Sequence, residues 1–218
     1  MPSKNSHTLR VGAMKNSLKV AITGGIGSGK SIVARILKTM GYPVYDCDSE
    51  ARRIMSDDKD IHRFLVEEIS PKAVVNGLID RKVVADVVFN NPDKLQRLNG
   101  EIHYRVKEDF ADYVEKSNSP VVFVETAILF SSDMHNMVDF IIDVTADMPT
   151  RIERIAMRNN LSESEIIERI EAQSDEMTTK ELYCRDARGV PFVVIDNSGS
   201  QAILPQIEEI LRRLRNYL

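Results

Sequence analysis

Residues 24–31 combine the residue types that hold phosphate groups. The segment is G-G-I-G-S-G-K-S, which satisfies the pattern G-x-x-x-x-G-K-[ST]. Its glycines allow backbone N–H groups to turn inward around phosphate oxygens, because no Cβ atom blocks the approach. We expect the loop to bind a nucleotide through Gly25, Ile26, Gly27, Ser28, Gly29, Lys30, Ser31 and Ile32.

Two side chains of this loop have roles of their own. Lys30 would reach the β- and γ-phosphates of ATP, which makes it a candidate catalytic residue. The hydroxyl of Ser31 would bind Mg²⁺, and the helix expected after it would point its positive end at the anion. Because glycine makes up about 7% of residues, the four fixed positions match by chance in about one chain of this length in a hundred. The loop therefore predicts a site for Mg-ATP.

Two carboxylates follow the next short apolar segment. Residues 42–45 predict a strand that ends at Asp46 and Asp48. Two residues separated by one other residue at a strand end face the same way. One carboxylate would therefore serve an acceptor hydroxyl, and the other would support the first carboxylate or bind magnesium. An exposed acidic turn would be the default explanation if the phosphate loop were absent. The sequence leaves open which of the two takes a proton.

Three arginines recur at helical spacing further along the chain. Arg151, Arg154 and Arg158 lie three and four residues apart, which places them on one face of a helix. Such a helix suits a lid whose arginines close over a transferring phosphate. A solvated helix face containing Glu153 would show the same spacing, and for any single arginine the two explanations weigh about equally.

The phosphate loop, the two carboxylates and the three arginines together favour a kinase among the proteins that carry such a loop. A GTPase would need the guanine-binding pattern N-K-x-D, which the sequence lacks. Residues 196–199 match D-x-x-G but stand too near the C-terminus, so we interpret them as a turn. A motor that acts on nucleic acid would need a longer chain and a basic surface, whereas this chain has 218 residues and a net charge of −4. We expect small-molecule substrates and no nucleic-acid partner.

The elements that must position these residues alternate along the chain. Apolar runs predict strands, and amphipathic stretches predict helices at 31–38 and 203–218. Continuous apolar strands are typical of a buried parallel sheet, so the fold class is a doubly wound α/β fold. The strands are expected at residues 18–23, 42–45, 120–125, 140–144 and 192–196.

Two further parts complete the expected kinase domain, residues 18–218. A helical substrate-binding insert spans residues 53–116, interrupted at Pro71 and Pro92, and a charged helical lid spans residues 151–181. Residues 1–17 are polar, without an apolar core of a secretory signal, and are expected to be a disordered leader.

The amino-acid composition excludes few further classes of protein. Hydrophobic residues make up 43% and charged residues 28%, which is ordinary for a soluble protein. No apolar run approaches the roughly 18 residues that a membrane span needs, so we expect no membrane partner. The two cysteines, Cys47 and Cys184, stand far apart with no C-x-x-C pair, which excludes a zinc or disulfide framework and favours the cytoplasm.

Five segments together resemble the dephospho-coenzyme A kinase family. Residues 23–31 match its opening T-G-G-I-G-S-G-K-[ST], and residues 46–52 match its D-A-D-x-x-A-R with Cys47 for the first alanine. Residues 98–103 are similar to its L-N-x-x-x-H, residues 169–173 to its R-x-x-x-Q, and residues 194–199 to its closing strand and turn. The resemblance covers roughly residues 18 to 215.

The resemblance implies transfer of the γ-phosphate of ATP to the ribose 3′-hydroxyl of dephospho-CoA. It makes Asp48 the general base and Arg154 and Arg158 the lid arginines. It places Arg52 and His103, together with Asp46 and Asp48, on the side of dephospho-CoA, although a structural role fits His103 about as well.

Three departures from the family pattern stand at Ile32, Tyr104 and Ser131, where the family has threonine, proline and an acid. Alternatives also stay open. Another metabolite kinase, a slow nucleotide-binding regulator or a weakly active member would share the loop. The sequence does not fix the oligomeric state, for which a monomer is the working expectation.

Overall fold

The computed structural model describes residues 17–159, 162–173, 176, 178–180, 183 and 190–218, without the side chains of Arg158 and Asn159. The expected leader lies outside the described residues except for its last one. Ser17 is 4% exposed, and its hydroxyl donates to the carbonyl of Ser119 over 2.8 Å. Ser17, which we assigned to the leader, therefore packs with the kinase domain.

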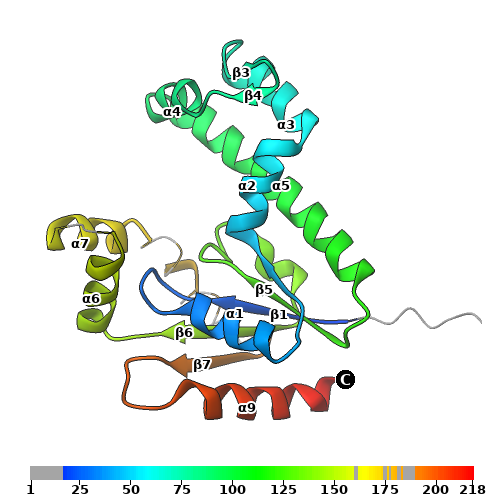
Figure 1. The fold of residues 1–218 in the computed structure, drawn as a ribbon, viewed down its shortest axis with the longest axis vertical. Coiled ribbons are helices and arrows are strands. Elements are labelled where there is room, and N and C mark those ends of the chain that lie inside the picture. The colour runs from blue at the N-terminus through cyan, green and yellow to red at the C-terminus, as the bar shows by residue number, and fades with distance from the viewer. Residues whose placement is uncertain (1–16, 160–161, 174–175, 177, 181–182, 184–189) are drawn as a thin grey trace, which may run out of the picture.

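A five-stranded parallel sheet forms the centre of the molecule (Figure 1). Its strands are β1 (Leu18–Thr23), β2 (Val44–Asp46), β5 (Val121–Glu125), β6 (Phe140–Thr145) and β7 (Phe192–Asp196), in the order β2-β5-β1-β6-β7. Every neighbouring pair is parallel, which confirms the fold class expected from the apolar runs. The expectation of full burial is wrong for β7: it is an edge strand, so Val194 is half exposed.

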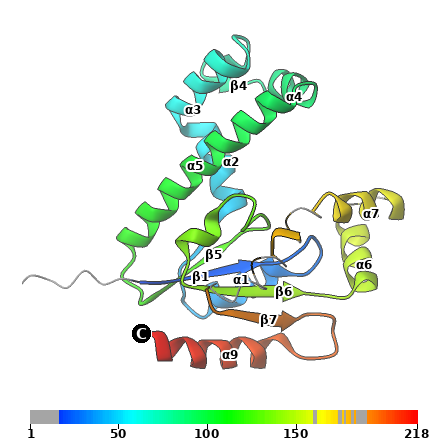
Figure 2. The same cartoon turned by 180° about the vertical axis from the view of Figure 1, so that it is seen from behind.

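Helices cover both faces of the sheet. On one face, α1 (Lys30–Thr39) and α9 (Ile203–Leu214) pack their apolar sides against β1, β5 and β6. A short 3₁₀ turn, Arg215–Tyr217, follows α9 in place of the last helical residues that we expected. The opposite face of the sheet packs against α2 and α5 of the insert (Figure 2). The two layers bury the phosphate loop's flanking strand and helix in the core.

The insert rises from one side of the sheet (Figure 1). It comprises α2 (Cys47–Asp57), α3 (Lys59–Phe64), a π-helical turn (Leu65–Ile69), α4 (Arg81–Phe89) and α5 (Pro92–Lys116). The expected interruption at Pro92 is present: α4 ends at Phe89, and Pro92 begins α5 behind the capping side chain of Asn91.

The insert also contains a β-hairpin that the helical expectation missed. Strands β3 (Val74–Val75) and β4 (Leu78–Ile79) pair antiparallel around Asn76 and Gly77. Both turn residues have positive φ, 52° and 77°, which is the conformation that Asn-Gly favours in two-residue hairpins.

The segment that we expected to form a lid contains the helix pair α6 (Met148–Asn159) and α7 (Glu163–Glu171), which stands apart at the carboxyl end of the sheet (Figure 1). It has a small core of its own, in which Ile155, Ile166 and Ile170 are buried. Ser162 begins α7 with a capping box to Glu165. A short 3₁₀ turn, Met134–Met137, precedes β6. Among the described residues, no helix combines the length and apolar character needed to cross a membrane.

The core predicts a contrast between two phenylalanines of the insert. Phe110 on α5 is fully buried against Tyr45, whereas Phe89 at the end of α4 is 87% exposed. We expect Phe110→Ala to lower the free energy of unfolding by about 3–5 kcal/mol, because it opens a cavity. Phe89→Ala, the control, should change it by less than about 0.5 kcal/mol. Urea unfolding measures both values, and similar losses in the two variants would contradict this packing.

Candidate active site

A cavity of about 590 Å³ opens at the carboxyl ends of β1, β2 and β5. It brings together most of the residues that the sequence singled out. Its lining comprises Ile26, Gly27, Gly29, Lys30, Ser31, Ile32, Asp46, Asp48, Arg52, Glu125, Ala127, Arg154, Ile155 and Gln173. Gly25, Ser28 and His103 are not among these residues, and the side chain of Arg158 lies outside the described part of the chain.

The phosphate loop has the conformation that its glycines make possible. Gly29 has φ of 95°, and a Cβ atom there would lie 2.1 Å from the side-chain nitrogen of Asn197. Helix α1 begins directly after it, so the N-terminal end of the helix lies at the cavity. The ammonium of Lys30 donates to the carbonyl of Gly24 over 2.8 Å. The loop is therefore shaped for an anion before any ligand arrives.

Asp46 and Asp48 both line the cavity, but they do not share a strand end as we expected. Strand β2 ends at Asp46, which caps α2, and Asp48 lies in the first turn of that helix. Asp46 accepts from the N–H groups of Asp48 and Ser49 and from the Ser49 hydroxyl. An aspartate cap satisfies the free N–H groups of a helix start, which is why the strand stops there. No hydrogen bond to the carboxylate of Asp48 occurs within the described residues.

Glu125 is a third carboxylate of the cavity, and the sequence analysis did not assign it a role. It ends β5 directly opposite Asp46 in the parallel register. Burial raises the pKa of its carboxyl, the negative charge of Asp46 raises it further, and the ammonium of Lys30 opposes both. Burial likewise lowers the pKa of Lys30. The position of Glu125 at the end of an apolar strand was the sequence signal that could have identified it as a site residue.

The first two lid arginines hold the phosphate loop from outside. Arg151 is 8% exposed, and its Nε donates to the carbonyl of Ile26 over 2.8 Å. Arg154 lines the cavity; its Nη2 donates to the carbonyl of Asn197 over 2.8 Å, and its Nη1 lies 3.4 Å from the carbonyl of Gly27. The alternative of a solvated helix face is therefore wrong for Arg151.

Asn197 is a site residue that the sequence analysis missed, because we interpreted residues 196–199 as a turn. It follows β7, is 4% exposed, and donates from its side chain to the carbonyl of Ser28 over 2.7 Å. A polar residue at the carboxyl end of a parallel strand was the available signal, since ligands of such sheets bind at that edge.

The remaining positions of interest do not line the cavity. His103 is half-buried on α5, where burial lowers the pKa of its imidazole and the charge of Lys107 lowers it further. Tyr104 is exposed and donates to Glu108 over 2.6 Å. The N–H of Ser131, where the family pattern has an acid, donates to the carboxylate of Glu176 over 2.8 Å. An acid from a distant segment thus contacts this turn.

A parallel sheet with a phosphate loop between β1 and α1, carboxylates at the strand ends and an arginine-bearing lid defines a P-loop kinase. The family model described as dephospho-CoA kinase matches residues 18–202. The chain belongs to the dephospho-CoA kinase family, whose members transfer phosphate from ATP. This sets aside the alternatives of another metabolite kinase and of a nucleotide-binding regulator.

Relatives and solved structures agree with this assignment. The dephospho-CoA kinase of Bacteroides fragilis is 35% identical over 196 residues, which cover 89% of this chain and 92% of the relative. That of Thermus thermophilus is 31% identical over 204 residues, covering 94% and 92%. A solved Thermus thermophilus structure has a TM-score of 0.71 at 31% identity, covering 93% and 98%. The dephospho-CoA kinase from Campylobacter jejuni, at 21% identity, TM-score 0.63 and coverage of 92% and 98%, shows the same fold.

The raised pKa of Glu125 predicts how stability depends on pH. A carboxyl whose pKa is higher in the folded protein than its ordinary value of 4.5 costs stability as pH rises through and above that value. We therefore expect Glu125→Gln to raise the free energy of unfolding at pH 7.5 and to change it less at pH 4.5. Urea unfolding at the two pH values measures this. Glu115→Gln, an exposed position on α5, is the control, and a Glu125→Gln variant that is less stable at pH 7.5 would contradict the expectation.

Proposed function

We propose that the cavity at the strand ends is where the γ-phosphate of ATP passes to the ribose 3′-hydroxyl of dephospho-CoA, with Asp48 as the general base. The observation that carries this proposal is the contrast between the two aspartates. Both oxygens of Asp46 accept hydrogen bonds at the start of α2, whereas the carboxylate of Asp48 has none within the described residues. Asp48 is therefore free to accept the proton of an incoming hydroxyl.

The nucleotide would occupy the phosphate loop. The N-terminal end of α1 and the ammonium of Lys30 place positive charge at one end of the cavity. A phosphate oxygen offers Lys30 a charged acceptor in place of the neutral carbonyl of Gly24. The backbone N–H groups and Lys30 would then orient the β- and γ-phosphates toward Asp48.

The residues present fit Mg²⁺ at this site. The Ser31 hydroxyl and the Glu125 carboxylate both line the cavity, and hard oxygen ligands are what Mg²⁺ prefers. Within the described residues, no group of three His, Cys, Asp or Glu side chains could hold a metal ion alone. This agrees with a cation that takes its other ligands from phosphates and water. When bound, Mg²⁺ would neutralise charge on the β- and γ-phosphates.

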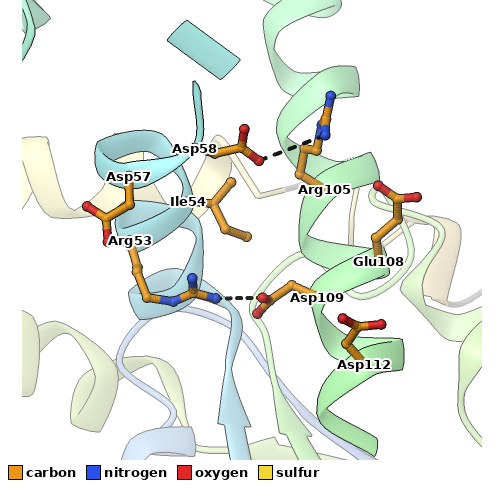
Figure 3. A pocket seen from close by; sticks show the side chains of 8 residues that line it. All are labelled: Arg53, Ile54, Asp57, Asp58, Arg105, Glu108, Asp109 and Asp112. Atoms are coloured by element: carbon orange, nitrogen blue, oxygen red, sulfur yellow. Dashed lines mark hydrogen bonds and ion pairs between the residues drawn. The ribbon is translucent and has the colours of Figure 1, made fainter. Parts of the chain in front are cut away.

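A second cavity, of about 490 Å³ between α2 and α5, is a poor site for either substrate (Figure 3). Five carboxylates and two guanidinium groups line it, and both arginines are already paired: Arg53 with Asp109 and Arg105 with Asp58. Excess negative charge repels a substrate that carries a diphosphate. We therefore place dephospho-CoA in the cavity of the phosphate loop, beside the exposed guanidinium of Arg52.

The lid would complete the site over the reacting groups. Arg154 already lines the cavity, and it would exchange its neutral carbonyl partners for the transferring phosphate. We assign the same role to Arg158, and we keep His103 on the side of the acceptor. Closure would exclude water and so suppress hydrolysis of ATP.

We also propose that the protein acts in the cytoplasm as a monomer. The two cysteines of the sequence stand 137 positions apart without a C-x-x-C pair, which supports a reducing compartment. Cys47 is free and buried, and burial raises the pKa of its thiol to about 12. The cavity already contains the phosphate loop, carboxylates and an arginine from one chain, so no second copy is needed to complete it.

The acceptor is tested by ADP production from Mg-ATP in the presence of dephospho-CoA, AMP, shikimate or no acceptor. We expect turnover only with dephospho-CoA, and its loss when EDTA removes the divalent cation. Faster turnover with another acceptor would contradict the proposed substrate. Turnover that survives EDTA would contradict the proposed Mg²⁺ dependence.

The role of Asp48 is tested by removing only its charge. We expect Asp48→Asn to lower kcat about 10²- to 10⁴-fold, the usual contribution of a general base, with normal binding of ATP. Asp57→Asn is the matched control, because Asp57 is exposed on the same helix but does not line this cavity. Steady-state kinetics measure both variants, and equal kcat values would refute the assignment.

A further inference from the structure

Ile26 lies in the middle of the phosphate loop, yet its N–H and its carbonyl both form hydrogen bonds with residues at the two ends of the lid. Its N–H donates to the side-chain oxygen of Gln173 over 2.8 Å. Its carbonyl accepts from Nε of Arg151 over 2.8 Å. Arg151 lies near the start of α6, and Gln173 follows the end of α7. The two ends of the lid therefore meet on a single residue of the phosphate loop, one on each of its two peptide groups.

The side chain of Ile26 belongs to the lid as well. It packs, with Ile152 and Ala156, against the small cluster of Ile155, Ile166 and Ile170 that forms the core of α6 and α7. The side chains of the loop's neighbouring strand and helix pack instead into the main core of the sheet. Ile26 is thus attached to the lid by two hydrogen bonds and by apolar packing.

The start of the lid lies too close to the loop to move independently of it. A Cβ atom on Gly27 would lie 2.9 Å from the carbonyl oxygen of Arg151, so only glycine allows α6 this approach. The guanidinium of Arg151 is buried beside Gly25, and its Nη2 has no partner among the described residues. A shift of α6 therefore requires a shift of the loop.

The chain after Gln173 is attached to the body of the protein. The carboxylate of Glu176 accepts from the N–H groups of Phe130 and Ser131, both over 2.8 Å. Lys180 donates to Asp143, which is 2% exposed on β6. Gln173 therefore marks the boundary between the lid and a segment held on the sheet, which is where a hinge would act.

We propose that Ile26 couples the lid to the phosphate loop, with Arg151 and Gln173 as positioning residues that act through it. Phosphates that bind the loop fix the backbone of Ile26, and its N–H and carbonyl hold the two ends of the lid. By linkage, a lid that holds Ile26 in place strengthens the binding of ATP. The inference rests on the proposed function only in taking this loop as the ATP site, and it requires no acceptor.

A fluorescence experiment isolates this coupling from turnover. The sequence contains no tryptophan, so Met157→Trp, at a position 78% exposed on α6, would introduce a single reporter of the lid. We expect its emission to change when Mg²⁺ and the non-hydrolysable analogue β,γ-imido-ATP are added without dephospho-CoA. Calorimetry measures the Kd of the same analogue.

Two variants break the coupling in different ways. In the Met157→Trp protein, Gln173→Met removes the acceptor oxygen at similar volume, and Ile26→Ala removes the packing but keeps the peptide. We expect each to raise the Kd of the analogue and the KM for ATP about three- to tenfold, the effect of losing one such contact. At saturating analogue, each should also lose most of the emission change. Glu171→Gln, at an exposed position at the end of α7, should alter neither quantity.

The outcomes separate this inference from the proposed function. If both variants bind the analogue with the wild-type Kd and show the full change in tryptophan emission, the proposed coupling is overturned. It is also overturned if the emission of the Met157→Trp protein does not change when the analogue is added. Failure to phosphorylate dephospho-CoA, with the emission change and its loss in both variants intact, would overturn the proposed acceptor and leave the coupling standing.

Discussion

The peptide groups of a phosphate loop impose one constraint on everything around them. When their N–H groups turn toward an anion, their carbonyls turn away from it, and a buried carbonyl without a donor is costly. Here one donor comes from the loop itself and two come from distant parts of the chain. Lys30 binds the carbonyl of Gly24, Arg151 that of Ile26, and Asn197 that of Ser28. The loop therefore depends on α6 and on the end of β7 for its shape.

The parallel sheet brings those donors to one place. Strand β1 is central, with β5 on one side and β6 on the other, so the loop after it is flanked by the carboxyl ends of both. The register sets Ile22 opposite Glu125 and Thr23 opposite Asp143. Each strand end then adds one polar group to a single edge, as is general for open α/β sheets. Strand β7 completes the arrangement from the far edge by carrying Asn197.

The fold followed from the sequence because its signals are local. Apolar runs placed the five strands, and glycine spacing placed the phosphate loop, since both patterns lie within a few residues. The start of α2 had a local signal as well, an aspartate cap, which we missed because we interpreted Asp46 and Asp48 as a strand end. The hairpin had its Asn-Gly turn at Asn76 and Gly77, which the helical interpretation of the insert overrode. The role of Asn197 could not be obtained in this way. Its partner, Ser28, lies 169 positions away, and only the folded sheet brings the two together.

The charges in the cavity show why a site for a polyanion can contain three carboxylates. Burial disfavours the charged forms of both Lys30 and Glu125, while their opposite charges favour ionisation of each other. Before ATP binds, the carboxylates thus help to keep Lys30 charged in a place where burial works against it. A nucleotide then brings a stronger partner for the ammonium, and a bound cation would offset the repulsion between phosphates and carboxylates. The carboxylates of the cavity thus support the proposal of a nucleotide that binds together with Mg²⁺, because the cation would offset their repulsion of the phosphates.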